Sequence, residues 1–168
     1  MGLFDFFKSK DTAVTVATEL RTLYLPIEGE VIPLADIGDG VFSEGVLGPG
    51  CGIKPKAETC CAPANGTIVQ VAESKHAIGL QTDDGVEVLI HVGLDTVDMN
   101  GNGFTVLVKL NQKVKCGQPM MKFDMNKIKA AGHPTTTAFL VTNPDEFSEV
   151  KVLQTGAMDK LTAVLKAE

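Results

Sequence analysis

The stretch "SKHAIGLQTDDGVEVLIHVG", residues 74–93, predicts a β-hairpin with a histidine near each end. Runs rich in aliphatic residues flank the turn sequence "TDDG". A four-residue loop would make His76 and His91 direct cross-strand neighbours, and a two-residue Asp-Gly turn would place them diagonally. A three-residue loop would put the two side chains on opposite faces of the sheet. We expect one of the two even-numbered loops, so that both imidazoles lie on one face.

Alternation along the two predicted strands places Ile78, Leu80 and Leu89 on the histidine face. Apolar surroundings and a second nearby imidazole both disfavour the charged form of a histidine. Both rings are therefore expected to be neutral and to keep a nucleophilic nitrogen. Spacing alone also allows the plainer alternative that the two histidines are ordinary core or surface residues of the hairpin.

Short β-type runs continue from about residue 24 to 125 and are separated by Gly, Pro, Asn or Asp. They include "GEVIPL", "GTIVQVA", "GFTVLVKL" and "PMMKFD". With 17 glycines and 8 prolines, the chain has little room for long helices before residue 125. The pattern predicts a mainly antiparallel all-β domain, either a sandwich or a barrel. Short helices are expected at 124–132 and from 143, and the apolar spacing of the tail from 158 favours a helix.

The chain has 168 residues and a formal net charge of −6, with 15 Lys and Arg against 21 Asp and Glu. The lack of a basic run and the small share of aromatic residues argue against nucleic-acid binding. No stretch is long and apolar enough to span a membrane, and no secretory signal is present, so a soluble, cytoplasmic protein is expected. The four cysteines lack C-x-x-C spacing and fit reduced thiols in that compartment.

Residues 1–21 are predicted to form a flexible or amphipathic segment that precedes a single domain at 22–168. The sequence "MGLFDFFKS" gathers its apolar side chains over only one short turn, so any contact with a membrane surface or a partner would be weak. Because the chain starts at Met1 and ends soon after this domain, it is expected to act as a free protein.

Three chemistries use paired histidines. Zinc sites need three or four protein ligands, and only His76 and His91 are evident. General acid–base catalysis would need a nucleophile motif such as G-x-S-x-G, which the chain lacks. A phosphoryl relay needs one imidazole to attack phosphorus and another to hold the phosphate oxygens, and these residues are present. Lys122 in "MMKF" is interpreted as a surface residue of a strand and His133 in "AGHP" as a surface loop residue.

Four segments of the chain match one known family in unbroken order. They are "IGDGVFSEGVLGPGCGIKP", "APANGTI", "SKHAIGLQTDDGVEVLIHVGLDTV" and "GFTVLVKLNQKVKCGQ". Together they resemble the glucose-type enzyme IIA component of the bacterial phosphoenolpyruvate-dependent sugar phosphotransferase system, over about residues 22 to 150. The part "LIHVGLDTV" is similar to that family's signature around its phosphorylated histidine. The resemblance implies an antiparallel β-sandwich with barrel-like character, a closing strand at the tail, and a phosphotransferase that requires no cofactor.

The resemblance also implies a reaction and its principal residues. His91 would accept a phosphoryl group through Nε2 from the phosphocarrier protein HPr and pass it to a cysteine on the IIB domain of a sugar permease. His76 would stabilise the phosphate during transfer. Ser74 stands where the family usually has Thr and belongs to the same catalytic group.

The surroundings of the histidine pair follow from the same resemblance. Asp39 and Asp95 correspond to the acidic residues that flank the site. Val41 and Phe42 correspond to the apolar rim on which partner proteins dock, and Gly93 would give a partner's phosphohistidine close access.

A second function also follows from the resemblance. Some relatives bind zinc between the two histidines with a carboxylate from a partner protein, and regulate permeases and kinases in their unphosphorylated form. The alternative function is therefore a non-catalytic, zinc-dependent regulatory module that binds the metal through His76 and His91.

Overall fold

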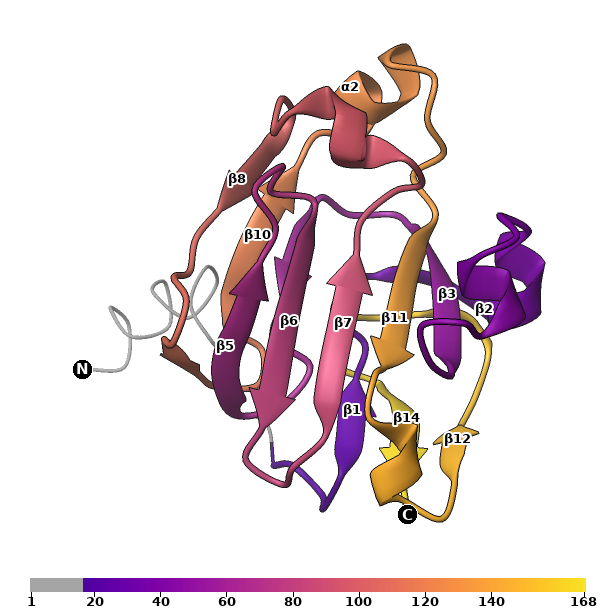
Figure 1. The fold of residues 1–168 in the computed structure, drawn as a ribbon, viewed down its shortest axis with the longest axis vertical. Helices are drawn as coiled ribbons and strands as arrows, with labels where there is room; N and C mark the ends of the chain where they lie inside the picture. Colours follow the sequence, from indigo (N-terminus) through magenta and orange to yellow (C-terminus); the bar gives the residue numbers. More distant parts are fainter. Residues whose placement is uncertain (1–16) are drawn as a thin grey trace.

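An eight-stranded antiparallel sheet is the largest element of the computed structural model, which describes residues 17–168 (Figure 1). Its strands in spatial order are β13 (Gly156–Met158), β2 (Gly29–Pro33), β3 (Gly50–Pro55), β11 (Thr137–Val141), β7 (Glu87–His91), β6 (Ala77–Thr82), β5 (Gly66–Val71) and β9 (Lys113–Val114). The sheet is open, because β13 and β9 are its two edges. This arrangement confirms the predicted all-β, antiparallel fold.

Two three-stranded sheets complete the β structure of the described residues. One has the order β1 (Thr22–Tyr24), β14 (Ala163–Ala167), β12 (Val150–Val152), and the other β4 (Thr59–Cys61), β10 (Pro119–Phe123), β8 (Phe104–Val106). The tail does not form the helix that its apolar spacing favours. It forms β14, which pairs with a strand on each of its sides. Two ladders satisfy the backbone of this segment, which outweighs local periodicity. The closing strand that the resemblance implies is what the structure has.

Helical structure within residues 17–168 is short. The α-helix α2 (Met125–Ala130) confirms the helix expected at 124–132, and the Asp124 side chain caps it by accepting the N–H of Lys127 at 3.1 Å. The 3-10 turns are η1 (Leu34–Ile37), η2 (Phe42–Glu44), η3 (Thr96–Met99) and η4 (Pro144–Glu146), the last of which is all that forms of the helix expected from 143. In this part of the chain, no helix combines the length and apolar character needed to cross a membrane.

The main hydrophobic core joins the three sheets. Fully buried side chains come from the large sheet, as with Ile53 and Phe139, and from both small sheets, as with Met121 and Leu165. Burial of each such side chain stabilises the fold by roughly 1.5–3 kcal/mol. The main core therefore covers one face of the large sheet.

A second, smaller apolar cluster covers the opposite face of the large sheet. It contains Ile32, Ile37, Phe42, Ala138 and Leu140. Successive residues of a strand point to opposite faces, so Leu140 of β11 joins this cluster whereas its neighbour Phe139 joins the main core.

Gly52 of β3 brings the η1–η2 segment onto this face. A Cβ at this position would lie 2.8 Å from the Cγ1 atoms of both Ile32 and Ile37. Because glycine leaves that space free, Ile37 can pack directly over the strand. The segment that follows Ile37 is thereby carried toward the end of β7.

The hairpin β6–β7 has a register that differs from both expected ones. Ala77 is paired with His91, and the loop is closed by the Thr82 N–H donating to the Val86 carbonyl at 2.8 Å. The loop therefore has three residues, with Gly85 at a φ of 90°. The Thr82 hydroxyl adds a hydrogen bond from the Val86 N–H at 2.9 Å, which fixes this odd-numbered loop.

The changed register also corrects the predicted histidine face. Ile78 and Leu80 belong to the main core, together with their cross-strand partners on β7. Leu89 does share the face of His91 and packs against the second cluster. The predicted segment at 1–21 lies outside the described residues as far as residue 16, and at its end the Arg21 N–H donates to Asp84 at the hairpin tip at 2.8 Å.

Candidate functional site

His91 is the last residue of β7, at the end of the strand that points toward α2 (Figure 1). Its backbone is paired with Ala77 of β6 on one side and Ala138 of β11 on the other. Two small neighbours leave the imidazole room to stand on the sheet face. The side chain is half-buried, so it is held firmly and still reaches the surface.

His76 meets His91 even though the register alone would separate them. The ring centroids are 4.6 Å apart and the ring planes are inclined at 78°. The reason is that β6 begins only at Ala77, while the backbone bends at Lys75 and His76, with Lys75 at a φ of 64°. Strand alternation therefore does not apply to His76, and its side chain turns toward His91.

The Gly93 carbonyl determines the tautomer of His91. It lies 2.9 Å from Nδ1 of His91, and a carbonyl can only accept a hydrogen bond. Nδ1 therefore carries the proton, which leaves the lone pair on Nε2.

The turn at Gly93 requires glycine. Its φ is 75°, and a Cβ would lie 2.5 Å from Cγ2 of Thr96 and 3.2 Å from the Pro134 carbonyl oxygen. Gly93 is buried, so the predicted role of offering bare backbone to a partner is not what this geometry favours. Its structural effect is to aim a carbonyl at the His91 ring.

Both histidines are electrostatically biased toward the neutral form. Burial lowers the pKa of His91, and the neighbouring His76 lowers it further, against the smaller opposing effect of the Gly93 carbonyl. Burial also lowers the pKa of His76, which is only 6% exposed. The predicted pair of neutral imidazoles is consistent with these directions.

Ser74 contacts His76 through its backbone. This backbone group partly opposes the lowering of the His76 pKa, although Nδ1 of His76 is buried without a hydrogen bond of normal geometry. Among the described residues, no hydrogen bond of the Ser74 hydroxyl is found. A catalytic role of that hydroxyl therefore remains a prediction.

Asp39 organises the loop between η1 and η2. Its carboxylate accepts the backbone N–H groups of Val41, Phe42 and Ser43 at 3.2, 3.1 and 3.0 Å. Burial alone would raise the pKa of Asp39, but these hydrogen bonds outweigh it and lower the pKa. The carboxylate is thus a negative charge that also shapes the loop.

The two residues after Gly40 have unequal exposure. Phe42 is buried and its ring lies against the His91 ring, with centroids 4.8 Å apart. Val41 is 47% exposed and forms an apolar edge beside the histidine. The predicted apolar rim therefore has one buried and one accessible member.

A cavity of about 350 Å³ opens at the His91 ring. The predicted residues that line it are Asp39, Val41, Phe42, His91 and Asp95. Leu94, Val97 and Pro134 also line it, and sequence reasoning missed them. Leu94 and Val97 follow the histidine closely in the chain, which could have signalled them, whereas Pro134 joins the site only through tertiary structure.

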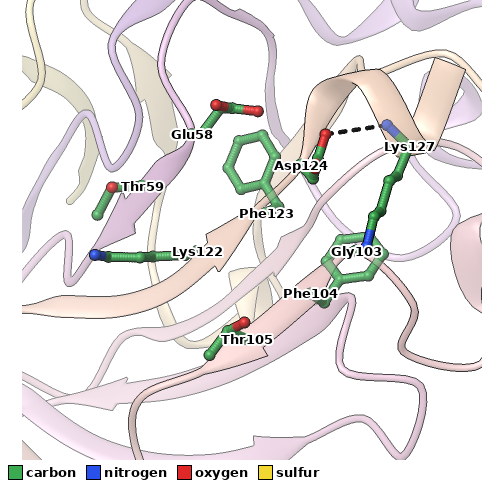
Figure 2. A pocket seen from close by; sticks show the side chains of 9 residues that line it. All are labelled: Glu58, Thr59, Gly103, Phe104, Thr105, Lys122, Phe123, Asp124 and Lys127. Atoms are coloured by element: carbon green, nitrogen blue, oxygen red, sulfur yellow. Dashed lines mark hydrogen bonds between the residues drawn. The ribbon is translucent and has the colours of Figure 1, made fainter.

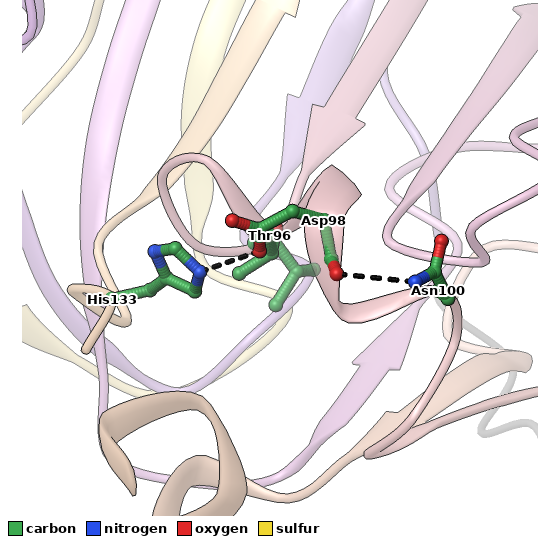
Figure 3. Close-up of polar contacts among 5 residues, drawn as sticks. Thr96, Asp98, Asn100 and His133 are labelled. Atoms are coloured by element: carbon green, nitrogen blue, oxygen red, sulfur yellow. Dashed lines mark hydrogen bonds and ion pairs between the residues drawn. The ribbon is translucent and has the colours of Figure 1, made fainter. Parts of the chain in front are cut away.

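His133 lies in a loop, as predicted, but it is less exposed than a surface residue. Its side chain is only 13% exposed, and its Nε2 lies 2.7 Å from Oδ1 of Asp98 (Figure 3). Asp98 supplies a polar partner that allows the imidazole to be covered, and the sequence spacing between the two gives no sign of the contact.

A larger cavity of about 410 Å³ lies over the small sheet of β4, β10 and β8, away from the histidines (Figure 2). Lys122 lies on its floor between Thr59 and Thr105 of the neighbouring strands and is exposed, which confirms it as a surface residue of a strand. The two carboxylates here bind the start of α2, since Glu58 accepts the N–H of Met125 and Asp124 that of Lys127. Helix capping thus accounts for these charges.

The four cysteines are free and buried. Burial raises the pKa of Cys51 to about 12 and that of Cys116 to about 11. A thiol with such a pKa carries very little thiolate at neutral pH. The free thiols agree with the expected reduced state, and none is poised as a nucleophile.

A resident metal site does not fit the residues described. The histidine pair supplies two imidazoles, one of which has its Nδ1 bound to the Gly93 carbonyl. Within residues 17–168, no group of three or more His, Cys, Asp or Glu side chains converges. Stable zinc binding would need ligands from another molecule.

Comparisons with known proteins find that the chain is similar to components of bacterial sugar transport systems. The sequence pattern of the family described as "phosphoenolpyruvate-dependent sugar phosphotransferase system, EIIA 1" matches residues 21–147. The chain is 41% identical over 150 residues to the PTS system mannose-specific EIIBCA component of Corynebacterium glutamicum, covering 89% of the chain and 22% of that protein. It is 45% identical over 134 residues to the PTS system glucose-specific EIICBA component of Staphylococcus carnosus, covering 80% and 20%.

A solved structure is also similar. Glucose permease IIA from Mycoplasma capricolum has a TM-score of 0.79 at 30% identity, with 90% of this chain and 98% of that chain covered. The curated relatives are much longer, and the chain spans about a fifth of their length.

Proposed function

Since the chain belongs to the EIIA 1 family of the phosphoenolpyruvate-dependent sugar phosphotransferase system, we propose that His91 carries a phosphoryl group between two partner proteins. The group would come from the phosphocarrier protein HPr and go to the IIB domain of a sugar permease. The observation that carries this proposal is the geometry of His91, whose Nδ1 is bound to the Gly93 carbonyl so that Nε2 keeps its lone pair.

The first step is an attack of Nε2 on the phosphorus of phospho-HPr. The Nε2–P bond forms as the donor N–P bond breaks, and the electron pair of the broken bond returns to the donor nitrogen. The His91 ring becomes more positive as the new bond forms. The Gly93 carbonyl, bound to Nδ1–H, stabilises that charge where it develops.

His76 acts on the phosphate and not on the proton of His91. Its ring lies at 4.6 Å from the His91 ring, within reach of a phosphoryl group on Nε2. Because its pKa is lowered by burial, it is neutral and offers one N–H donor to a phosphate oxygen. We propose that this hydrogen bond matters most in the second step, when the N–P bond of His91 breaks and a cysteine thiolate of IIB takes the phosphorus.

The rim around His91 is proposed to bind both partners. Val41 and Val97 are 47% and 56% exposed at the cavity beside the histidine, and apolar surface of this kind is buried in protein complexes. Asp39 and Asp95 add negative charge at the same edge, which attracts partners that carry basic residues. The reduced cysteines support a cytoplasmic location for these encounters.

No cofactor is proposed for either transfer step, because the imidazole itself forms and breaks the bond to phosphorus. The zinc-dependent regulatory module is the less supported function. His76 and His91 would be the two ligands from this chain, and a partner protein would have to complete the site.

The test is labelling with radioactive phosphoenolpyruvate in the presence of enzyme I and HPr. The wild-type protein should take up one acid-labile phosphoryl group, and His91→Gln should take up none. Asp145→Ala is the control, since Asp145 is exposed and lies beyond the end of β11 that is remote from His91, and it should still reach full labelling. Normal labelling of the His91→Gln variant would show that the phosphoryl group is carried elsewhere.

A further inference from the structure

The contact between His133 and Asp98 joins two segments that lie far apart in the sequence. Nε2 of His133 and Oδ1 of Asp98 are 2.7 Å apart, and Figure 3 shows the two side chains turned toward each other. The His133 side chain is 13% exposed and that of Asp98 is 67% exposed. The imidazole is therefore the fixed member and the carboxylate the accessible one.

His133 is anchored by its own backbone. Its N–H donates to the carbonyl of Ile128, a fully buried residue of α2, at 3.1 Å. The following residue is proline, which restricts the backbone on both sides of the peptide bond. The 133–134 segment is thus a firm support attached to α2.

Pro134 connects the 133–134 segment to the turn beside His91. Its carbonyl accepts the N–H of Leu94 at 3.1 Å, and it lies within 3.2 Å of where a Cβ of Gly93 would be. Gly93 in turn holds Nδ1 of His91 at 2.9 Å. The turn that orients the nucleophile therefore rests on the 133–134 segment.

Asp98 fixes the other end of the same loop. It lies in η3, which follows the turn, and the hydroxyl of Thr96 ties the start of η3 to the Val92 carbonyl at 2.6 Å. Within this loop, Thr96 is buried, whereas Asp95 has a positive φ and Val97 is 56% exposed, so these two side chains do not hold the loop in place. The contact between Asp98 and His133 holds the loop at 93–98 against the 133–134 segment.

We propose that His133 and Asp98 are a positioning pair that holds the His91 ring in the tautomer with its proton on Nδ1. Asp98 accepts a hydrogen bond from Nε2–H of His133, which presses the loop against Pro134 and keeps the Gly93 carbonyl aimed at Nδ1. Neither residue touches the phosphoryl group. The role in transfer rests on the proposed phosphorylation of His91, whereas the effect on the ring does not.

The experiment compares Asp98→Ala with Asp98→Asn in the 168-residue chain. Alanine removes the acceptor, and asparagine keeps an acceptor oxygen at the same place without the charge. Because the Asp98 side chain is largely exposed, neither change opens a cavity in the core. Asp145→Ala is the matched control, since Asp145 is an exposed aspartate beyond the opposite end of β11.

Two measurements decide the outcome. Nitrogen NMR of the His91 ring reports how much of the ring has its proton on Nδ1, and rapid-quench labelling by phospho-HPr reports the transfer rate. For Asp98→Ala we expect the Nδ1–H tautomer to lose population and the rate to fall about fivefold, the factor set by one net hydrogen bond. Asp98→Asn should recover most of both values, and Asp145→Ala should match the wild type.

Each result has one meaning. Asp98→Ala with an unchanged His91 ring spectrum would overturn the positioning pair, as would Asp98→Asn with the same loss as alanine. If the wild-type protein takes up no phosphoryl group, the proposed function fails, and the ring spectra alone still decide whether the pair positions His91.

Discussion

Replacement of Gly93 by alanine tests how the orientation of His91 is built. The added methyl group would meet Cγ2 of Thr96 at 2.5 Å, and the residue would have to adopt a φ of 75°. An L-residue in the left-handed region costs about 1–2 kcal/mol. If Thr96 rotates to avoid the methyl group, its 2.6 Å hydrogen bond to the Val92 carbonyl is lost, which costs about 1 kcal/mol more.

Gly85→Ala is the matched control for this experiment. Gly85 has a φ of 90° at the hairpin tip, and a Cβ there would have no neighbour within 4 Å. This variant should therefore lose only the backbone contribution of about 1–2 kcal/mol. Urea unfolding should show Gly93→Ala to be less stable than Gly85→Ala by about 1 kcal/mol, which corresponds to the lost hydrogen bond.

The same two variants separate stability from function. Displacement of the Gly93 carbonyl should weaken its contact with Nδ1 of His91, so labelling by phospho-HPr should be slow even in buffer where the variant is fully folded. Gly85→Ala should label at the wild-type rate. Equal unfolding free energies for the two variants, together with equal labelling rates, would refute the close-packing account of Gly93.

Two further predictions concern charge. In His76→Gln, NMR titration should show the pKa of His91 closer to its ordinary value, because one of the two main causes that lower this pKa has been removed. An unchanged or lower pKa would contradict this expectation. Labelling of His91 should survive in this variant, while onward transfer to IIB should fall. Asp39→Ala should lose about 1–2 kcal/mol of unfolding free energy at pH 7, when compared with the exposed control Asp36→Ala, through lost hydrogen bonds to the loop. Because the pKa of Asp39 is lowered in the folded protein, the carboxylate contributes to the unfolding free energy above pH 3.8, and this contribution is lost as the pH falls through the lower folded pKa. The unfolding free energies of the wild type and Asp39→Ala should therefore converge in acid. A difference between them that stays constant down to about pH 2 would count against this reasoning.

The hairpin shows how far local pattern predicts structure. The run from 74 to 93 does form two antiparallel strands, and the glycine of "TDDG" does mark the turn. The loop length was wrong, because a single hydroxyl on Thr82 and a left-handed Gly85 favour the three-residue loop. The histidines still meet, because His76 lies in a bend where strand alternation has ended.

Local pattern did not determine the conformation of the tail or the surroundings of His133, for a different reason. The apolar spacing of the tail is compatible with a helix, but two neighbouring strands are available to pair with 163–167. His133 is covered because a carboxylate 35 residues earlier in the chain comes within hydrogen-bond distance. Neither fact has a trace in the local sequence, since both depend on which segments the fold makes adjacent.

The sequence by itself determined the β-class of the fold, the hairpin and the two histidines of the candidate site, because strand propensity, turn residues and side-chain chemistry act over a few neighbouring positions. Only the tertiary structure decided which distant residues complete the site. The sheet order β3, β11, β7 brings Phe42 against the His91 ring and the Pro134 carbonyl against the turn at Gly93. That convergence depends on packing between elements, and packing partners are chosen by the whole chain.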